Sequence, residues 1–306
     1  MSQTTSDILM IRPAHFAFNE ETAGNNEFQT RDDRLEDAQK VAVKEFNAMT
    51  KLLRSKGVRV HVIQDTAEPI KPDAVFPNNW LSTHAVNTLI TWPMYAFNRR
   101  TERREKIVAH LGSLFHIDQN IHYERYESEH IFLEGTGSLV FDRENKIAYA
   151  CLSDRTHNAL ISVFCRDMGY TAIVFHALDE QQKSIYHTNV MMAIGEKVAV
   201  VCSEGILDES REKVLDSLRN SGKEILNINF DQMCHFAGNV IELKNTDGQS
   251  LMVLSKTAHR ALQKEQLQLL EKHSELVVVD IPVIETIGGG SVRCMICEIF
   301  LEPRFS

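Results

Sequence analysis

One pattern of apolar and polar positions recurs along the chain: an amphipathic helix, a glycine or polar stop, and a short apolar strand. In its first copy the apolar residues between Asp32 and Lys56 recur at spacings of three and four, which predicts a helix that Gly57 ends. The alternation over residues 58–63 predicts the strand that follows. Another short apolar strand is expected at residues 8–11.

The same order of elements returns in later parts of the chain. Asp154, Asp208 and Ser255 stand where N-cap residues are expected, and Gly169 and Gly222 stand where two of the helices should stop. A weaker copy of the helix covers residues 99–115. The predicted helices span 154–168, 208–220 and 255–273, and the strands that follow them span 171–175, 225–228 and 276–279.

Apolar strand pairs that begin with short polar motifs lie between these helices. The motifs start near residues 75, 132, 186, 235 and 290, so their spacing is about 50 to 60 residues each time. Such a period predicts a repeat architecture in which the units bury their apolar faces against one another around an axis. The polar motif of every unit would then face one central cavity. No linker rich in Pro, Gly or Ser divides the chain.

Composition narrows the class of protein. The chain has 306 residues, of which 43% are hydrophobic and 25% charged, as in ordinary globular proteins. The net charge of −9 argues against a nucleic-acid partner, because such binding needs concentrated Lys and Arg. No apolar run of about 18 residues could cross a membrane, and the first residues do not resemble a secretion signal. We therefore expect a cytoplasmic protein.

Cys294 is the most reactive candidate in the motif near residue 290. Three glycines, 288–290, precede it, and glycine allows positive φ and close approach of a ligand. A thiol after such a turn, at the mouth of an apolar run, can act as a nucleophile; the alternative is an unreactive core cysteine. Cys294 and Cys297 form a C-x-x-C pair. Residues three apart in a strand face opposite sides, so one should face the site and the other the packing layer.

A nucleophilic thiol needs a base or an electropositive setting. His187 and Glu134 open two of the other motifs and are the candidate partners, although a histidine is often a satisfied core or surface residue and a glutamate can end a strand in solvent. The segment 135–137 lacks the Lys-Ser/Thr of a phosphate loop, and no H-E-x-x-H motif or paired His/Asp cluster indicates a metal. Neutral amides at matching places either form turns or bind substrate; they are Asn78, Asn79, Asn189 and Asn239.

With these motifs in order, the chain resembles the guanidine-group-modifying superfamily with the five-bladed α/β propeller, or pentein, fold. The segments 13–16, 76–80, 186–192 and 289–295 look like the arginine-deiminase-related branch of citrulline-utilisation hydrolases and amidinotransferases. The resemblance covers nearly the whole chain. It implies an α/β fold with pseudo-fivefold ββαβ repeats and a single catalytic domain over residues 1–306.

The resemblance also implies roles for matching residues. Cys294 matches the nucleophile, His187 the general acid and base, and Glu134 the carboxylate that holds the substrate nitrogens and the histidine. Arginine deiminases have carboxylates where this chain has Asn79, Asn189 and Gly137. The substrate would be a small amino acid, and no cofactor is required.

Exchange of carboxylates for amides changes the expected substrate. A buried guanidinium needs counter-charges, whereas a neutral ureido group needs both a donor and an acceptor, which asparagine supplies. We therefore expect hydrolysis of citrulline to ornithine, ammonia and carbon dioxide through a covalent cysteine adduct. The alternatives are an arginine-deiminase-like hydrolase, an amidinotransferase and a non-catalytic binding protein on the same scaffold. Arg12 and Arg293 are the candidates to bind the substrate carboxylate. Assembly into a homo-oligomer and closure of residues 19–30 as a lid are left open.

Overall fold

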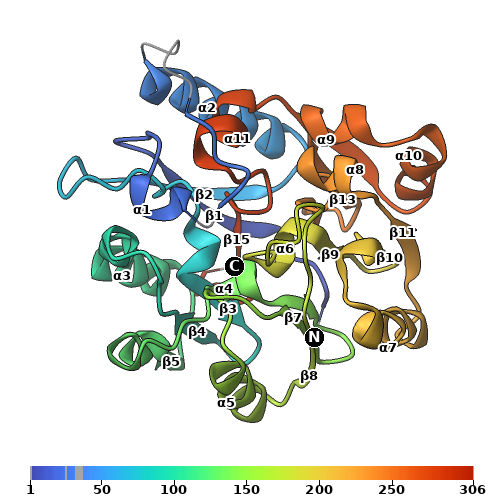
Figure 1. Cartoon of the computed structure of the whole chain (residues 1–306). Helices are drawn as coiled ribbons and strands as arrows, with labels where there is room; N and C mark the ends of the chain where they lie inside the picture. Colours follow the sequence, from blue (N-terminus) through green and yellow to red (C-terminus); the bar gives the residue numbers. More distant parts are fainter. Residues whose placement is uncertain (1, 25, 32–36, 306) are drawn as a thin grey trace.

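Five three-stranded sheets surround a central axis in the computed structural model, which describes residues 2–24, 26–31 and 37–305. Figure 1 views the ring along this axis, with the longer helices at the rim and the short helices α4 and α6 near the centre. In each sheet the middle strand pairs antiparallel with an inner strand and parallel with an outer strand. The radial repeat predicted from the period and the five-bladed α/β propeller implied by the family resemblance are confirmed.

Several inner strands of neighbouring blades contact one another around the axis, since β15 contacts β3 and β9 contacts both β6 and β12. In order along the chain, the sheets are β15-β1-β2, β3-β4-β5, β6-β7-β8, β9-β10-β11 and β12-β13-β14. Their bounds are β1 Asp7–Arg12, β2 Arg59–Gln64, β3 Leu81–His84, β4 Thr88–Thr91, β5 Gln119–His122, β6 Val140–Asp142, β7 Ile147–Cys151, β8 Thr171–Phe175, β9 Met192–Ile194, β10 Val198–Val201, β11 Glu224–Asn227, β12 Ile241–Lys244, β13 Ser250–Ser255, β14 Glu275–Val279 and β15 Cys297–Glu298.

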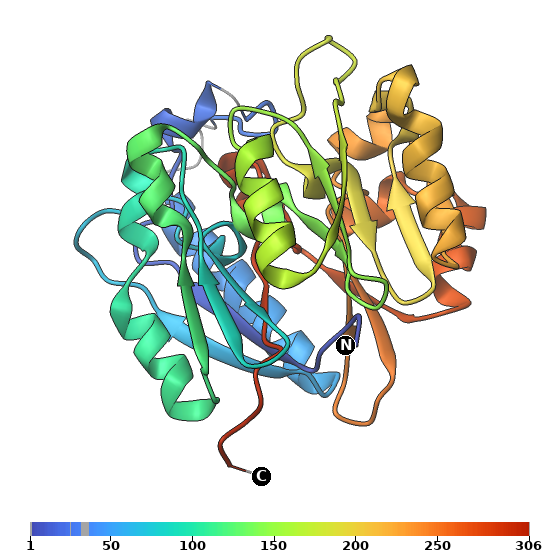
Figure 2. The same cartoon turned by 90° about the horizontal axis from the view of Figure 1, so that it is seen from below.

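A helix connects the middle strand of each blade to its parallel outer strand, since a parallel pair requires a crossover. These helices lie on the outside of the ring in Figure 2. The helices that make these crossovers are α2 Ala38–Ser55, α3 Glu105–Leu114 after η2 Asn98–Glu102, α5 Asn158–Met168, α7 Asp208–Asn220 after η4 Ser203–Gly205, and α9 Lys256–Ala261 with α10 Lys264–Glu271. The remaining helices are α1 Glu20–Ala23, η1 Pro77–Asn79, η3 Tyr123–Glu129, α4 Gly135–Ser138, α6 Thr188–Met191, α8 Phe230–Cys234 and α11 Pro282–Gly288.

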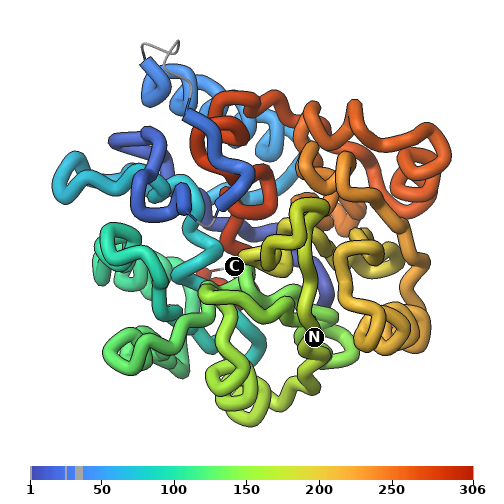
Figure 3. The backbone as a smooth tube through the Cα atoms, viewed as in Figure 1, coloured from blue at the N-terminus to red at the C-terminus, as the bar shows by residue number. Residues whose placement is uncertain are grey.

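The last strand of the chain completes the first blade. β15 pairs antiparallel with β1, with Ile8 opposite Glu298 and Leu9 opposite Cys297. In Figure 3 the tube passes once around the ring and its red end returns beside its blue beginning. The segment that contains Cys294 therefore lies next to the first blade, although it is far from it in sequence.

Apolar residues fill the space between the blades and under the helices. The middle strands β4 and β10 are buried along their whole length, as expected for strands covered on both faces. The outer strand β5 is mostly exposed. This difference explains why β10 is a continuous apolar run, whereas β5 is mostly polar.

The polar motifs form single helical turns before the inner strands, and not strand starts as the sequence predicted. η1, α4 and α6 precede β3, β6 and β9, and a turn at residues 292–295 precedes β15. Gly135 has φ +48°, and a Cβ there would stand 2.4 Å from the carbonyl oxygen of Asn78, so only glycine fits. The apolar run after Cys294 contributes only the two residues of β15 to a sheet.

Several predicted helix boundaries need correction. The first helix begins after its N-cap Asp37, and the predicted start at residues 32–36 lies outside the described residues. His157 caps α5 in place of Asp154, because residues before it form an irregular turn. Ser255 caps its helix as predicted, but that helix ends at Ala261, and a second helix begins at Lys264.

Candidate active site

A small buried cavity lies where the single helical turns converge on the axis. Its volume is ≈ 20 Å³. The side chains around it come from the motifs near residues 75, 186 and 290, from the loop after β1, and from Arg99 and Arg155. The lining residues are Thr22, Asn26, Asp73, Phe76, Asn79, Arg99, Arg155, Tyr186, His187, Gly288, Gly289, Gly290 and Cys294.

Cys294 lies in the turn before β15, and its thiol faces amides. The Nδ2 atoms of Asn239 and Asn189 lie 3.3 and 3.5 Å from Sγ, and the backbone N–H of Cys294 donates to the carbonyl of Ser291 at 3.0 Å. Burial raises the pKa of the Cys294 thiol, and the hydrogen bond from Asn239 opposes this only in part. The resting cysteine is therefore a neutral thiol at neutral pH.

The glycines before Cys294 allow other parts of the chain to approach it closely. Gly289 ends α11 with φ +64°, and a Cβ there would stand 2.6 Å from the side chain of Asn26. A Cβ on Gly288 would stand 2.7 Å from the ring of Phe76. The glycine run thus forms the cavity wall against which the loop after β1 and the motif near residue 75 pack.

His187 and Glu134 form a buried hydrogen-bonded pair. The Nε2 atom of His187 lies 2.8 Å from Oε2 of Glu134, and both side chains are almost fully buried. Burial lowers the pKa of His187 to about 4, although Glu134 raises it. Burial would raise the pKa of Glu134, but Arg155 and His187 together hold it below its usual value. An ionised Glu134 can only accept, so His187 carries its proton on Nε2 and keeps the Nδ1 lone pair free.

Both oxygens of Glu134 are already engaged within the described part of the chain. Oε1 accepts the backbone N–H of Tyr95 at 2.9 Å, and Oε2 contacts His187 and, at 3.6 Å, Arg155. This arrangement fixes the carboxylate and orients the imidazole. It leaves no oxygen of Glu134 without a partner.

Three charged residues that the sequence analysis did not select gather around Thr22. Asp73 accepts from the Thr22 hydroxyl at 3.4 Å, Arg155 donates to the Thr22 carbonyl at 3.4 Å, and Arg99 lies 3.7 Å from Asp73. Oδ1 of Asp73 is buried and has no hydrogen-bond partner among the described residues. Burial raises the pKa of Asp73. Of the three, only Asp73 lies close to a motif in sequence, and this proximity does not distinguish it from other charged residues.

Arg99 is anchored from several sides. Its guanidinium donates to both oxygens of Glu102, at 2.8 and 3.0 Å, to Oδ1 of Asn79 at 2.7 Å and to the Phe76 carbonyl at 3.2 Å. Four of its five N–H groups are therefore used within the described residues, and one remains for a ligand.

The four predicted amides occupy different places. Asn189 and Asn239 contact the thiol, and Asn79 holds Arg99 while its Nδ2 has no partner among the described residues. Asn78 is fully buried beside Gly135, and both of its side-chain polar atoms lack partners within the same residues. Only Asn79 of the four lines the cavity.

Arg12 and Arg293 do not lie in this cavity. Arg12 donates to the side chains of Asn47 and Gln64 at the end of β1. Arg293 points away from Cys294 into another cavity, where it is paired with Glu298 at 2.8 Å. Arg293 directly precedes Cys294 but lines the other cavity, so proximity to the cysteine in sequence was misleading.

The loop over residues 19–30, of which all but residue 25 are described, packs over the cavity. Asn19 donates to Asp73 at 2.7 Å, Asn26 donates to the Gly289 carbonyl at 3.4 Å, and Phe28 stacks near Tyr186 with ring centroids 6.2 Å apart. The cavity beneath it holds no more than one or two water molecules, so an amino acid can enter only if this loop moves.

No helix of the described residues is both long and apolar enough to cross a bilayer. Nor does the described part of the chain contain three or more His, Cys, Asp or Glu side chains grouped to hold a metal ion.

Comparison with known proteins identifies the family. Residues 12–301 match the family described as N,N dimethylarginine dimethylhydrolase, eukaryotic. The chain belongs to this family. Its membership confirms the expected guanidine-group-modifying superfamily. No curated protein matches the chain.

Solved structures confirm the pentein fold. One similar structure is the N-terminal domain of ArgZ, an arginine dihydrolase from the ornithine-ammonia cycle in Cyanobacteria, in a cysteine variant bound to substrate. Its TM-score is 0.72 at 15% identity, and the match covers 97% of this chain and 98% of that one. Full-length ArgZ gives a TM-score of 0.73 at 15% identity, and the match covers 97% of this chain. The chain spans only 41% of the length of that protein. A dimethylarginine dimethylaminohydrolase adduct with S-methyl-L-thiocitrulline gives 0.67 at 15% identity over 97% of this chain and 100% of that one.

Proposed function

We propose that the chain is a cysteine hydrolase that attacks the guanidino or ureido carbon of a free α-amino acid of the arginine type, and that citrulline is its preferred substrate. The observation that carries the proposal is the distribution of charge in the cavity. Charged side chains gather around Thr22, whereas the hydrogen-bond partners of the Cys294 thiol are neutral amides.

The cluster of Asp73, Arg99 and Arg155 matches the α-carboxylate and the α-ammonium group of a free amino acid. A substrate α-carboxylate requires cationic donors, which Arg99 and Arg155 supply at one wall of the cavity. A substrate α-ammonium requires an acceptor, and Oδ1 of Asp73 is a buried carboxylate oxygen without a partner among the described residues. This pairing favours a free amino acid over a substrate whose α-amine is blocked.

The reacting end fits a neutral group better than a cation. The charge of Glu134 is already shared with His187 and Arg155, so it balances a guanidinium beside the thiol less well. A ureido group offers a carbonyl oxygen and N–H groups, and an asparagine side chain complements both. Asn189 already donates toward Sγ, and its Oδ1 has no partner among the described residues.

The first chemical step uses two neutral groups. Burial raises the pKa of Cys294 and lowers that of His187, so both groups start neutral. The thiol proton therefore passes to Nδ1 of His187 only as Sγ attacks the ureido carbon. Glu134 stabilises the imidazolium that forms. The imidazolium then gives its proton to the terminal nitrogen, the C–N bond breaks, and ammonia leaves a thiocarbamate on Cys294.

The second step restores the cysteine. His187 takes a proton from water, the resulting hydroxide attacks the thiocarbamate carbon, and the C–S bond breaks with return of the proton to sulfur. The product is the carbamate of ornithine, which loses carbon dioxide. Citrulline and one water therefore give ornithine, ammonia and carbon dioxide.

The deciding experiment incubates the protein with citrulline, arginine and N,N-dimethylarginine, and measures ammonia, dimethylamine and amino-acid products by mass spectrometry. Cys294→Ala should abolish turnover. Cys297→Ala is the matched control, because Cys297 is also buried but donates to the Leu81 carbonyl outside the cavity.

Ornithine and ammonia from citrulline would support the proposal. Turnover of arginine alone would limit the chain to guanidino hydrolysis and refute the argument from the amides. Release of dimethylamine from dimethylarginine as the fastest reaction would also refute the argument from the amides. Transfer to an added amine in place of water would indicate an amidinotransferase.

A further inference from the structure

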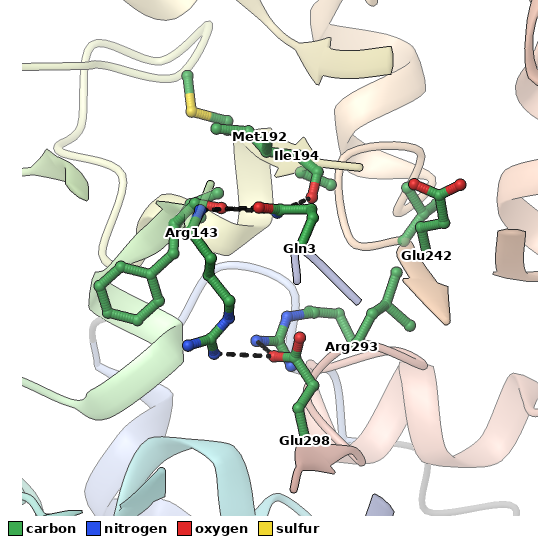
Figure 4. Close-up of a pocket in the computed structure, with 12 residues that line it drawn as sticks. Gln3, Arg143, Met192, Ile194, Glu242, Arg293 and Glu298 are labelled. Carbon is green, nitrogen blue, oxygen red and sulfur yellow. Dashed lines mark hydrogen bonds and ion pairs between the residues drawn. The ribbon is translucent and has the colours of Figure 1, made fainter. Parts of the chain in front are cut away.

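A second cavity lies among the inner strands of the propeller. Its volume is ≈ 30 Å³, and side chains of β6, β9, β12 and β15 line it together with Gln3 (Figure 4). The side-chain amide of Gln3 donates to the carbonyls of Phe141 and Ile194, each at 2.9 Å, and accepts the backbone N–H of Arg143 at 2.7 Å. Gln3 thus fixes one wall without using the charged groups.

Two arginines in this cavity share one carboxylate oxygen. Nη2 of Arg293 lies 2.8 Å from Oε2 of Glu298, and Nη2 of Arg143 lies 3.6 Å from the same oxygen. Nη1 of Arg143 is buried and has no hydrogen-bond partner among the described residues. Arg143 is only 2% exposed, so bulk water does not solvate its charge.

The other acidic groups nearby do not balance this charge. Glu242 lines the cavity, but its oxygens accept the Glu196 backbone N–H at 2.5 Å and the Ser274 hydroxyl at 2.8 Å, and in Figure 4 its carboxylate points away from the guanidinium groups. Asp142 lies 3.8 Å from Nζ of Lys223. The two guanidinium groups therefore carry one positive charge in excess of the carboxylate that they contact.

We propose that this cavity binds a small inorganic monovalent anion, of the size of chloride or nitrate, between Arg143 and Arg293. Its volume corresponds to about two water molecules, since one water needs about 10–15 Å³, so amino acids and nucleotides are too large. The rings of Phe300 and Phe141 lie 4.0 and 5.0 Å from the Arg143 guanidinium carbon. They cover its faces and leave its N–H edge for the anion.

The anion would act on the reactive cysteine through the chain. Arg293 directly precedes Cys294, and its charge helps to lower the pKa of a thiol that burial raises. An anion bound to Arg293 would weaken that effect. Alkylation of Cys294 at neutral pH should therefore slow as the cavity fills.

The test compares sodium chloride with sodium gluconate at equal ionic strength, because gluconate is too large for the cavity. We expect a saturable rise of Tm in chloride alone and about threefold slower alkylation of Cys294 by iodoacetamide at saturation, equivalent to half a pKa unit. Neither readout requires a substrate, so failure here is distinguishable from failure of the proposed hydrolase function.

Three variants assign the effect. Arg143→Met should remove the chloride dependence, and Arg103→Met, which loses an arginine paired with Glu127 elsewhere, should keep it. Glu298→Gln removes the negative charge beside both guanidinium groups and should lower the chloride concentration at half-saturation. This variant tests the proposal if Arg143→Met does not fold. Equal behaviour in chloride and gluconate, or a chloride effect that survives Arg143→Met, would overturn the proposal. So would bromide-soaked crystals whose anomalous peak lies away from Arg143 and Arg293.

Discussion

Gly137 controls the position of the proposed base. A Cβ on this residue would stand 2.5 Å from Nδ2 of Asn79 and 2.9 Å from both Cε1 and Nδ1 of His187. Gly137 lies in α4 and is not among the glycines with positive φ, so its backbone accepts alanine without strain. Since ordinary contacts begin near 3.4 Å, Gly137→Ala must move Asn79 by about 0.9 Å and the imidazole by about 0.5 Å.

The imidazole cannot make that movement freely, because Nε2 is held 2.8 Å from Glu134. A misplacement of about 1 Å near the reacting atoms costs on the order of 10²-fold in rate. We expect Gly137→Ala to lower kcat roughly 10- to 100-fold, with a loss of about 1–3 kcal/mol in stability from overpacking. Ammonia release as a function of substrate concentration gives kcat and KM, and urea unfolding gives the stability.

Gly112→Ala is the matched control. Gly112 also lies in a helix, α3, but its nearest neighbour to a new Cβ would be Ile117 at 3.6 Å, an ordinary contact. This variant should keep wild-type kcat and gain up to about 1 kcal/mol from helix propensity. If Gly137→Ala instead kept kcat within twofold of wild type, His187 would not be held as we describe.

Three further predictions concern binding, pH and support of the cysteine. Arg99→Lys loses the planar guanidinium and should raise KM at least about tenfold, with a smaller change in kcat. Arg12→Ala should leave KM unchanged. The reverse result would show that Arg12 binds the substrate carboxylate. Burial raises the pKa of Glu45 from 4.5 to about 7. Because the folded-state pKa lies above the unfolded value, the contribution of protonated Glu45 to the free energy of unfolding is complete below pH 4.5. It is lost as pH rises through 7, and the loss is about 3 kcal/mol. Glu45→Gln should therefore flatten the fall of Tm between pH 5 and 8, and identical slopes would contradict the assignment. Ser291 donates to Glu285 at 2.6 Å and supports the turn that contains Cys294. Ser291→Ala should therefore lower the stability of the fold by about 1–3 kcal/mol and change the pH profile of Cys294 alkylation. Thr257→Val removes a different hydrogen bond to Glu285 and should change the stability only.

The blades were predictable because their signals are local. Apolar spacing gave the helix before β2, and Gly169 ended α5 in the left-handed conformation expected of a C-cap. The single helical turns of the motifs were not predictable, since four residues are too few to show a helical period. Gly135 illustrates this, because its role depends on close approach of Asn78, which is distant in sequence.

The site was predictable only where chemistry and repeat position coincided. His187 and Glu134 open corresponding motifs, and the structure pairs them. Asp73, Arg99 and Arg155 lie outside the glycine- and asparagine-containing turns, and only the packing of the loop after β1 brings them together around one residue. Long-range contacts of this kind have no sequence period.

Closure of the ring and assembly of the site depend on the same contacts. The turn of Cys294 leads directly into β15, whose partner is β1, and the loop that covers the cavity follows β1. That loop returns to the glycine wall, where Asn26 contacts Gly289 and the N–H of Thr30 donates to the Thr286 carbonyl at 2.7 Å. The thiol, its glycine wall and the loop therefore belong to one blade, which forms only when strands from opposite ends of the chain pair. Movement of the loop to admit a substrate breaks contacts to the segment that carries Cys294, so loop opening and the position of the thiol are coupled.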